Sequence, residues 1–128
     1  MSLPHHNLVA WQRADDLFVE LHLLTRQRFP RFEQYELGSQ IRRAAYSVPA
    51  NMVEGIARTS AREVCRFLNV SSSSLSEAAY GIHAATRLGY LTDEEEAAFE
   101  QKVRLISGPL RGLIARYRDR GGGGSLRG

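Results

Sequence analysis

The sequence predicts an all-α protein, a single domain folded as an antiparallel up-down-up-down four-helix bundle. Four segments carry apolar residues at steps of three and four, which is the spacing of one face of an α-helix. Prolines and capping signals separate these segments by short connections, so consecutive helices should run antiparallel. No segment shows the period-two alternation or the hairpin dipeptides of β-strands. The chain of 128 residues is long enough for one hydrophobic core, to which we assign residues 1–120.

The first predicted helix runs from Leu8 to about Arg28. Asn7 precedes it and is expected to be its N-cap, because an asparagine side chain accepts hydrogen bonds from the free N–H groups of a first turn. Pro30 ends it, since the residue before a proline disfavours the helical conformation. Its apolar residues are Ala10, Ala14, Leu17, Leu21 and Leu24, with Trp11 and Phe18 alongside.

The second predicted helix runs from about Glu36 to Ala57, and the rest of the bundle is organised around it. Pro49 lies inside this helix and should kink it, because proline removes one backbone hydrogen bond and crowds the preceding turn. Its apolar face consists of Ile41, Ala44, Ala45, Val48 and Met52.

The other face of this helix is polar without being uniformly charged. It carries, at steps of three and four, Gln40, Arg43, Ser47, Asn51 and Glu54. Together with Glu77 of the next helix we call these residues the polar seam. Amides and hydroxyls mixed with single charges suit a partly buried, hydrogen-bonded contact between helices. An active or binding site on this face is the alternative.

Capping boxes open the third and fourth predicted helices. Ser60 to Glu63 starts the third helix, which runs to Leu88, and Thr92 to Glu95 starts the fourth. Gly89 is placed to end the third helix with a Schellman motif. Pro109 should bend the fourth helix, and the Gly-rich residues 121–128 predict a disordered tail.

The topology also predicts which residues of the second and third helices face each other. The connection centres near Arg58 and Thr59, so residues equidistant from it should meet. The predicted pairs are Ser47 with Ser71, Arg43 with Ser74 and Glu77, and Glu54 with Arg62. These partners would satisfy the polar seam, which a buried charge requires.

One end of the predicted bundle is rich in arginine. The second-to-third connection meets the end of the fourth helix there, and we call its residues Arg58, Arg62, Arg66, Arg116, Arg118 and Arg120 the basic end. The first three form one ridge if the third helix extends back to Arg58. A segregated arginine patch is a candidate nucleic-acid-binding surface, because guanidinium groups bind phosphate. A solvated, partly self-paired end is the alternative.

Composition adds a mild basic bias and few other constraints. The formal net charge is +3, and 16 of the 17 basic residues are arginine, a preference that genome base composition also produces. The single cysteine, Cys65, excludes an intramolecular disulfide, as expected in a reducing compartment. No apolar run approaches the ~20 residues of a membrane span. The N-terminal residues lack a signal-peptide core, so we expect a cytoplasmic protein.

The sequence carries none of the recognisable catalytic or metal-binding motifs. Di-iron bundles need Glu-x-x-His pairs, but neither His22 nor His83 follows an acid by three residues. Glycine-rich phosphate loops, paired-cysteine motifs and Ser/His/Asp arrangements are missing as well. We therefore predict a protein that is not an enzyme and that uses neither a metal nor a cofactor.

Several stretches resemble one known family, the 23S ribosomal RNA intervening-sequence proteins. The similar stretches are Leu8 to Ala14, Phe29-Pro30 with Glu33, Gln40 to Ala45, Ser47, Asn51 to Gly55, Arg58 and Ser74 to Glu77. Ser73 departs from the family, which often has glycine there. The resemblance covers the chain from Leu8 to about Tyr117 and is most specific in Gln-Ile-Arg-Arg-Ala-Ala and Asn-x-x-Glu-Gly.

This resemblance implies a small four-helix bundle that forms homo-oligomers, including five-membered rings, without established enzymatic activity. Some members are encoded inside insertions of ribosomal RNA genes. A more distant group is similar to accessory proteins of diversity-generating retroelements, which bind nucleic acid and a reverse transcriptase. The family therefore implies a pentameric ring of this chain and points to RNA or another nucleic acid as a partner.

Residues outside the predicted core independently favour self-association. Trp11, Phe18, Tyr46, Val53 and Ile56 widen the apolar arcs of the first two helices beyond one core face. The sequence thus leaves three hypotheses. The first is an oligomeric bundle that binds nucleic acid through the basic end, and the second is a structural or protein-interaction module. The third is an enzyme with an unrecognised site in the polar seam.

Overall fold

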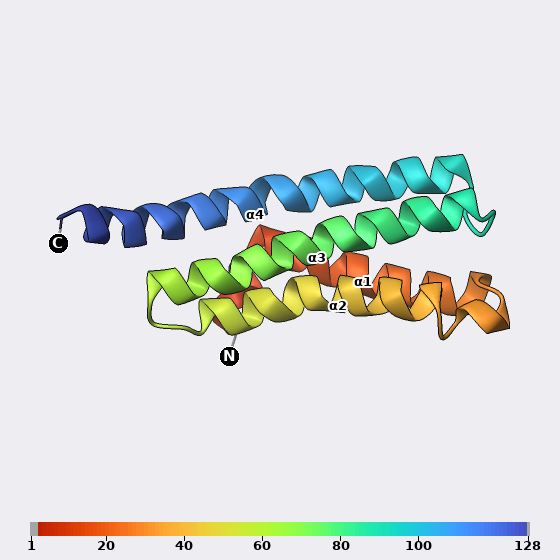
Figure 1. Ribbon diagram of the computed structural model, residues 1–128, viewed down its shortest axis with the longest axis horizontal. Helices are drawn as coiled ribbons and strands as arrows, with labels where there is room; N and C mark the ends of the chain where they lie inside the picture. The colour runs from red at the N-terminus through yellow and green to blue at the C-terminus, as the bar shows by residue number, and fades with distance from the viewer. Residues whose placement is uncertain (1–2, 128) are drawn as a thin grey trace.

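The computed structural model describes residues 3–127, with side chains as far as Gly121. Four long helices run antiparallel to their neighbours in sequence (Figure 1). They are α1 Val9–Arg28, α2 Leu37–Ile56, α3 Ala61–Arg87 and α4 Asp93–Arg127, with 3-10 turns η1 Pro4–Asn7 and η2 Arg31–Glu33. Residues 3–127 contain no strand. The all-α bundle predicted from the sequence is confirmed.

The core consists of the apolar stripes that helical periodicity predicted. All five residues of the apolar face of α2 are at most 4% exposed, as are Ala10, Ala14, Leu17 and Leu21 of α1. Leu68, Ile82, Ile106 and Leu110 complete the centre from α3 and α4. Burial of these side chains is the main force holding the helices together, at about 25 cal/mol per Å² of apolar surface.

The caps at the α3 ends and at the start of α4 follow the sequence closely. Ser60 Oγ accepts a hydrogen bond from the backbone N–H of Glu63 at 3.3 Å. Gly89 has a φ of 84°, and the backbone N–H of Tyr90 bonds to Ala85 O at 2.9 Å, as in a Schellman motif. At α4, Thr92 Oγ1 accepts from the N–H of Glu95 at 3.1 Å, and the Glu95 carboxylate accepts from the N–H of Thr92 at 2.9 Å.

The start of α1 differs from the prediction. Asn7 belongs to η1, and the N-cap position of α1 is taken by Leu8, which makes no side-chain capping bond. Gln12 instead donates from its side chain to His6 O at 2.7 Å. The extra 3-10 turn moves the helix start, so the Asn7 cap was wrong.

α2 and α3 are staggered by about one helical turn relative to the predicted register. Ser47 meets Ser74, with 2.8 Å between their Oγ atoms, whereas Ser71 donates to Val48 O at 2.8 Å. Pairing symmetrically about Arg58 and Thr59 was therefore wrong for Ser47. Small residues let the two helices approach closely: Gly55 lies against Val64 and Phe67, and Gly81 lies against Ile41.

Both helices that contain a proline continue through it, α2 through Pro49 and α4 through Pro109. The backbone of α4 extends through the Gly-rich segment to Arg127, while Gly128 lies outside the described residues. Each glycine disfavours a helix by about 1 kcal/mol relative to alanine. The disordered tail therefore stays a prediction.

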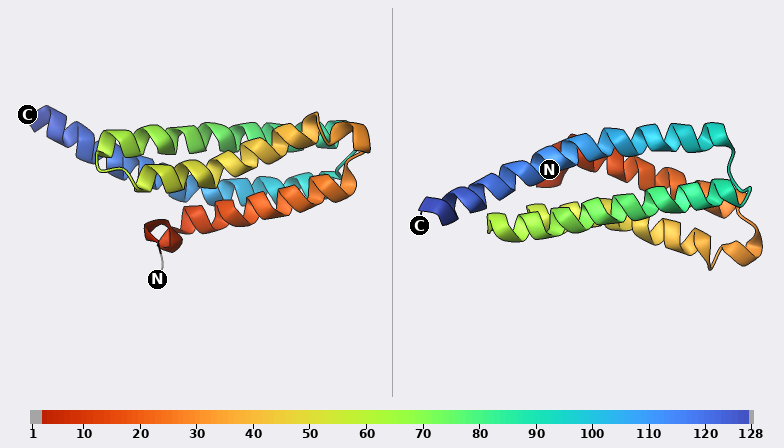
Figure 2. Two further views of the ribbon diagram at one scale, coloured as in Figure 1. Left: turned by 90° about the horizontal axis from the view of Figure 1, so that it is seen from below. Right: turned by 45° about the horizontal axis from the view of Figure 1, so that its top comes forward.

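The ends of the bundle are different in character. The α2–α3 connection, the start of α1 and the end of α4 lie at one end, and the α1–α2 and α3–α4 connections lie at the other (Figures 1 and 2). α4 overhangs the first of these ends in all views. None of the helices in residues 3–127 is long and apolar enough to cross a membrane.

Candidate nucleic-acid interface

The basic end is built from the α2–α3 connection, the first turns of α3 and the last described turns of α4. α4 passes close to the start of α3, because a Cβ placed on Gly121 would stand 3.9 Å from Ala61 Cβ and 3.9 Å from Arg62 N. One turn further along α3, the Cys65 thiol donates to Ile114 O at 3.6 Å. The topology thus gathers six exposed arginines at this end: Arg58, Arg62, Arg66, Arg116, Arg118 and Arg120.

These arginines do not form the continuous ridge considered from the sequence. α2 ends at Ile56 and α3 begins at Ala61, so Arg58 lies in the connection between them. Of Arg58, Arg62 and Arg66, the three residues of the predicted ridge, only Arg62 and Arg66 share a helix face. The capping box at Ser60 starts α3 too late for Arg58 to join the ridge.

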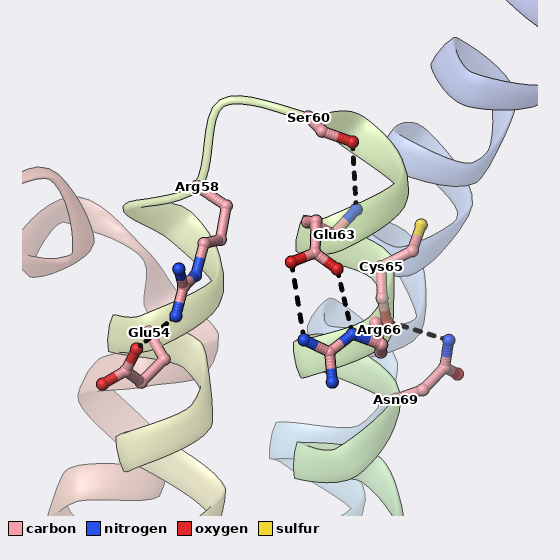
Figure 3. A network of polar contacts seen from close by, with 7 residues as sticks. All are labelled: Glu54, Arg58, Ser60, Glu63, Cys65, Arg66 and Asn69. Carbon is pink, nitrogen blue, oxygen red and sulfur yellow. Dashed lines mark hydrogen bonds and ion pairs between the residues drawn. The ribbon is translucent and has the colours of Figure 1, made fainter.

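Two of the six arginines are paired with acids of their own helix or connection (Figure 3). Arg58 contacts Glu54 at 3.0 Å, and Arg66 reaches Glu63 with two guanidinium nitrogens, at 3.0 and 3.5 Å. Hydrogen bonding by Arg66 lowers the pKa of the Glu63 carboxyl and raises the pKa of Arg66 itself. Both pairs are solvent-exposed, so they are weak and open readily to a competing anion.

Aromatic rings hold guanidinium groups at the same end. The guanidinium carbons of Arg58 and Arg66 lie 4.8 and 4.6 Å from the centroid of the Phe67 ring. Arg120 lies over the Tyr117 ring at 4.8 Å. Such contacts restrict the arginines without neutralising their charge. This aromatic component was not part of the sequence prediction, although Phe67 one residue after Arg66 was a visible signal.

The remaining arginines carry most of the uncompensated charge. Within residues 3–121 no ion pair includes Arg62, Arg116, Arg118 or Arg120. The acids in the same segments are Glu54, Glu63 and Asp119, and Asp15 of α1 lines a cavity together with Glu54. The end is therefore positively charged overall and carries donors that match phosphate oxygens.

The polar seam is only partly the contact expected from the sequence. Asn51 Nδ2 donates to Ser47 O and Ser47 Oγ, each at 2.9 Å, and Ser74 Oγ donates to Ser47 Oγ. These three residues form a half-buried network between α2 and α3. Gln40, Arg43 and Glu77 are exposed and line, with Ser47 and Ser74, an open cavity of about 350 Å³.

Glu54 does not belong to this buried contact. Its side chain is 59% exposed and pairs with Arg58, not with Arg62. The ion pair predicted between Glu54 and Arg62 is not among those of residues 3–121, where Glu54 pairs with Arg58. Among the described residues, no three His, Cys, Asp or Glu side chains gather in a group that could hold a metal ion.

The family comparison is decisive for this chain. The 23S rRNA-intervening sequence protein family matches residues 6–112. The chain belongs to this family. The family recognised from the sequence is thus confirmed, on a match that spans nearly all of α1 to α4 up to Gly112.

A solved structure agrees with the fold of this 23S rRNA-intervening sequence protein. It is the crystal structure of a protein of unknown function of the S23 ribosomal protein family from Bacteroides thetaiotaomicron. The two chains superpose with a TM-score of 0.76 at 21% identity, over 83% of this chain and 98% of the other. Among curated proteins none matches this sequence. At this identity the likeness concerns the fold alone.

An apolar groove between α1 and α2 contains four of the five residues that widened the apolar arcs. Trp11, Phe18, Tyr46 and Val53 line a cavity of about 330 Å³ together with Pro49, Ala50 and two acids, Asp15 and Glu54. Tyr46 is 59% exposed and meets the Phe18 ring edge-on, with 5.5 Å between centroids. Four of the residues that predicted self-association thus lie together in one groove of this family member. Self-association itself stays a prediction.

Sequence reasoning missed a second arginine cluster, at the α1–α2 end of this 23S rRNA-intervening sequence protein. Arg26, Arg31 and Arg42 line one cavity there. Arg42 lies inside the family-like stretch Gln40 to Ala45, but the helical pattern did not reveal its neighbours. They come from α1 and from the irregular segment after it, which periodicity does not place.

Proposed function

We propose that this protein is a non-enzymatic bundle that binds nucleic acid, RNA in particular, through the basic end. The observation that carries the proposal is the gathering of six exposed arginines from α3, α4 and the α2–α3 connection, four of which have no acidic partner in residues 3–121. Arginine-rich surfaces of this kind bind phosphate backbones without needing a cleft. The family's name also associates it with 23S rRNA.

The weak exposed pairs fit the same role. Arg58 and Arg66 sit over the Phe67 ring while paired with Glu54 and Glu63, so a phosphate has only to displace exposed carboxylates. Phe67 and Tyr117 hold guanidinium groups close to the helix surface, which lowers the entropy lost when they bind phosphate. The interface is expected to recognise the phosphate backbone of the nucleic acid more than its base sequence.

Self-association would strengthen such binding. We propose that copies of the chain meet through the groove of Trp11, Phe18, Tyr46 and Val53 and, as the family resemblance implies, form a pentameric ring in the cytoplasm. A ring presents several basic ends to one RNA, and linked sites bind more tightly than single ones. A structural or protein-interaction module without nucleic acid is the alternative, favoured by the same groove.

The salt dependence of RNA binding tests the proposal. Fluorescence anisotropy with a labelled single-stranded RNA should give a log–log salt slope of about −0.7 for each phosphate neutralised. The double variant Arg62→Gln/Arg118→Gln should reduce the magnitude of that slope by about 1.4. Arg87→Gln/Arg104→Gln removes the same charge from exposed positions elsewhere on α3 and α4 and should leave the slope unchanged.

Two results would refute the proposed interface. One is the lack of binding to mixed RNA and DNA at low salt. The other is an equal loss of affinity in both double variants, which would show that net charge acts without a defined surface. If the protein does bind RNA, sequencing the RNA that it retains from total cellular RNA would identify the class of RNA bound.

A further inference from the structure

A second cluster of arginines lies at the opposite end of the bundle from the basic end. An open cavity of about 360 Å³, which we call the arginine pocket, lies between the α1–α2 connection and the adjoining ends of α1 and α2. It is lined by Arg26, Phe29, Arg31, Gln34, Tyr35 and Arg42, so no carboxylate lines it. α2 alone separates the two ends by 20 residues, about 30 Å of helix.

Arg42 is the fixed centre of the arginine pocket. Its guanidinium donates to Thr25 Oγ1 at 3.0 Å, to Gln34 Oε1 at 3.3 Å and to Gln34 O at 2.6 Å. Gln34 is itself held, because its Nε2 donates to Thr25 O at 2.8 Å and to Phe29 O at 3.0 Å. The partners of Arg42 are all neutral, so its charge is positioned without being neutralised.

The space around Arg42 is fitted to its guanidinium. A Cβ on Gly38 would stand 3.0 Å from Arg42 Nη1 and 2.9 Å from Glu33 O. Any other residue at this position would push against the guanidinium or the backbone beside it. Desolvation lowers the pKa of Arg42, and the nearby charge of Arg26 lowers it further, which is what an unneutralised cluster produces.

Two acids near this end, Glu95 and Glu33, have other partners, and the exposed Glu36 does not line the cavity. Glu95 holds Arg28 with two hydrogen bonds, at 2.7 and 3.1 Å. Glu33 accepts from the Tyr90 hydroxyl at 2.8 Å and from the N–H of Leu37 at 3.3 Å. Arg26, Arg31 and Arg42 are in none of the ion pairs described for residues 3–121. Three guanidinium groups around one cavity therefore lack an anion.

We propose that the arginine pocket binds the phosphate group of a nucleotide, with the base stacked on Tyr35. Guanidinium forks match phosphate oxygens, and Arg42 is already oriented. Tyr35 lines the same cavity and is 86% exposed, which leaves a ring face for an aromatic base. The cavity lies at the small end of the range for ligand sites, as fits one nucleotide.

The test uses the full chain and four probes, measured by NMR titration: AMP, adenosine, inorganic phosphate and the trinucleotide ApApA without a terminal phosphate. AMP should bind more tightly than inorganic phosphate, and adenosine should bind least. If AMP binds more tightly than ApApA, the ligand is a free nucleotide. If ApApA binds more tightly than AMP, the ligand is an internal phosphate of an RNA chain. Both results support the pocket.

Variants at exposed positions locate the binding without threatening the fold. Arg26→Gln and Arg31→Gln should each weaken AMP binding about tenfold, the loss of one strong hydrogen-bonded contact. Tyr35→Ala should weaken AMP but not inorganic phosphate. Arg104→Gln removes the same charge from an exposed position of α4 outside both the arginine pocket and the basic end, and should leave AMP affinity unchanged. Circular dichroism confirms that each variant is folded.

Clear outcomes overturn the inference. They are no saturable binding of AMP or phosphate up to about 10 mM, or equal effects of Arg26→Gln and Arg104→Gln. An unchanged AMP affinity in Tyr35→Ala would overturn the assignment of a nucleotide. Because Arg26 and Arg31 do not belong to the basic end, and Arg62 and Arg118 do not line the arginine pocket, failure here is distinguishable from failure of the proposed RNA interface.

Discussion

Gly81 of α3 lies directly against Ile41 of α2, at the centre of the bundle. A Cβ added to Gly81 would stand 2.6 Å from Ile41 Cγ1 and 3.3 Å from Ile41 Cδ1. Both residues are buried, so neither side has room to yield. We predict that Gly81→Ala lowers the free energy of unfolding by about 1–3 kcal/mol, the usual cost of overpacking a core. Urea denaturation measures the change.

Gly112 supplies the matched control on α4. It is also helical and is exposed, and an added Cβ would meet nothing within 4 Å. Gly112→Ala should therefore stabilise the protein by about 0.5–1 kcal/mol, because alanine loses less backbone entropy on helix formation. If Gly81→Ala were stabilising as well, helix propensity would outweigh the contact with Ile41 and the packing argument would fail.

Ser71 provides the second prediction, since it is fully buried in the α2–α3 contact. Its Oγ donates to Val48 O at 2.8 Å. We predict that Ser71→Ala costs about 1 kcal/mol, the net value of one buried hydrogen bond. Ser73→Ala, at an exposed position of the same serine run, should change stability by less than about 0.5 kcal/mol. Equal effects in the two variants would contradict a specific role for the Ser71 bond.

Residue patterns that are local in the sequence predicted most of this fold. They did not predict how the helices are positioned along one another. The Ser60 and Thr92 capping signals and the Gly89 terminator depend on neighbours in sequence. The Thr92 box and the Gly89 terminator form as predicted, whereas Ser60 caps α3 but Glu63 pairs with Arg66 and does not complete the box. The pairing of Ser47 depends on how α3 is positioned along α2, which is a matter of contacts between residues far apart in sequence, such as Gly81 with Ile41.

The same distinction applies to the candidate site. The six arginines could be assigned to one end of the bundle from the sequence, because this assignment needs only the order and direction of the helices. It could not tell that Glu54 is exposed and bound to Arg58, since an acid four residues before an arginine suits both a buried seam and a surface pair. The arginine pocket was missed because Gln34 and Arg31 come from a segment without periodicity.

Glu95 gives the third prediction, on acid stability. Hydrogen bonds from Arg28 and from the backbone N–H of Thr92 lower the pKa of its carboxyl in the folded protein. The unfolded-state value is about 4.3. Glu95 therefore stabilises the fold fully above that pH, and the contribution disappears as the pH falls through its lower folded-state pKa. Glu95→Gln should reduce stability at pH 7 and flatten the acid side of the stability curve.

Thermal melts between pH 3 and pH 7 would measure this effect. Glu94→Gln is the control, because Glu94 is exposed on the same first turn of α4 and takes part in no ion pair of residues 3–121. A Glu95→Gln melting curve that keeps the wild-type pH dependence would show that another carboxylate controls acid unfolding.

The fourth prediction concerns self-association through the groove between α1 and α2. The ring of Tyr46 is 59% exposed beside Phe18, and Trp11 and Val53 continue the apolar surface. Apolar clusters of this kind on a small bundle favour contact with another copy of the chain. We predict a light-scattering mass near five times 14.4 kDa for the wild type. Tyr46→Glu should shift the mass towards the monomer, because a contact between copies would bury an unpaired charge.

Tyr80 of α3 is 71% exposed and supplies the control, because it lies outside the groove. Tyr80→Glu should leave the assembly intact. For the wild type, a mass near 14.4 kDa would refute the ring.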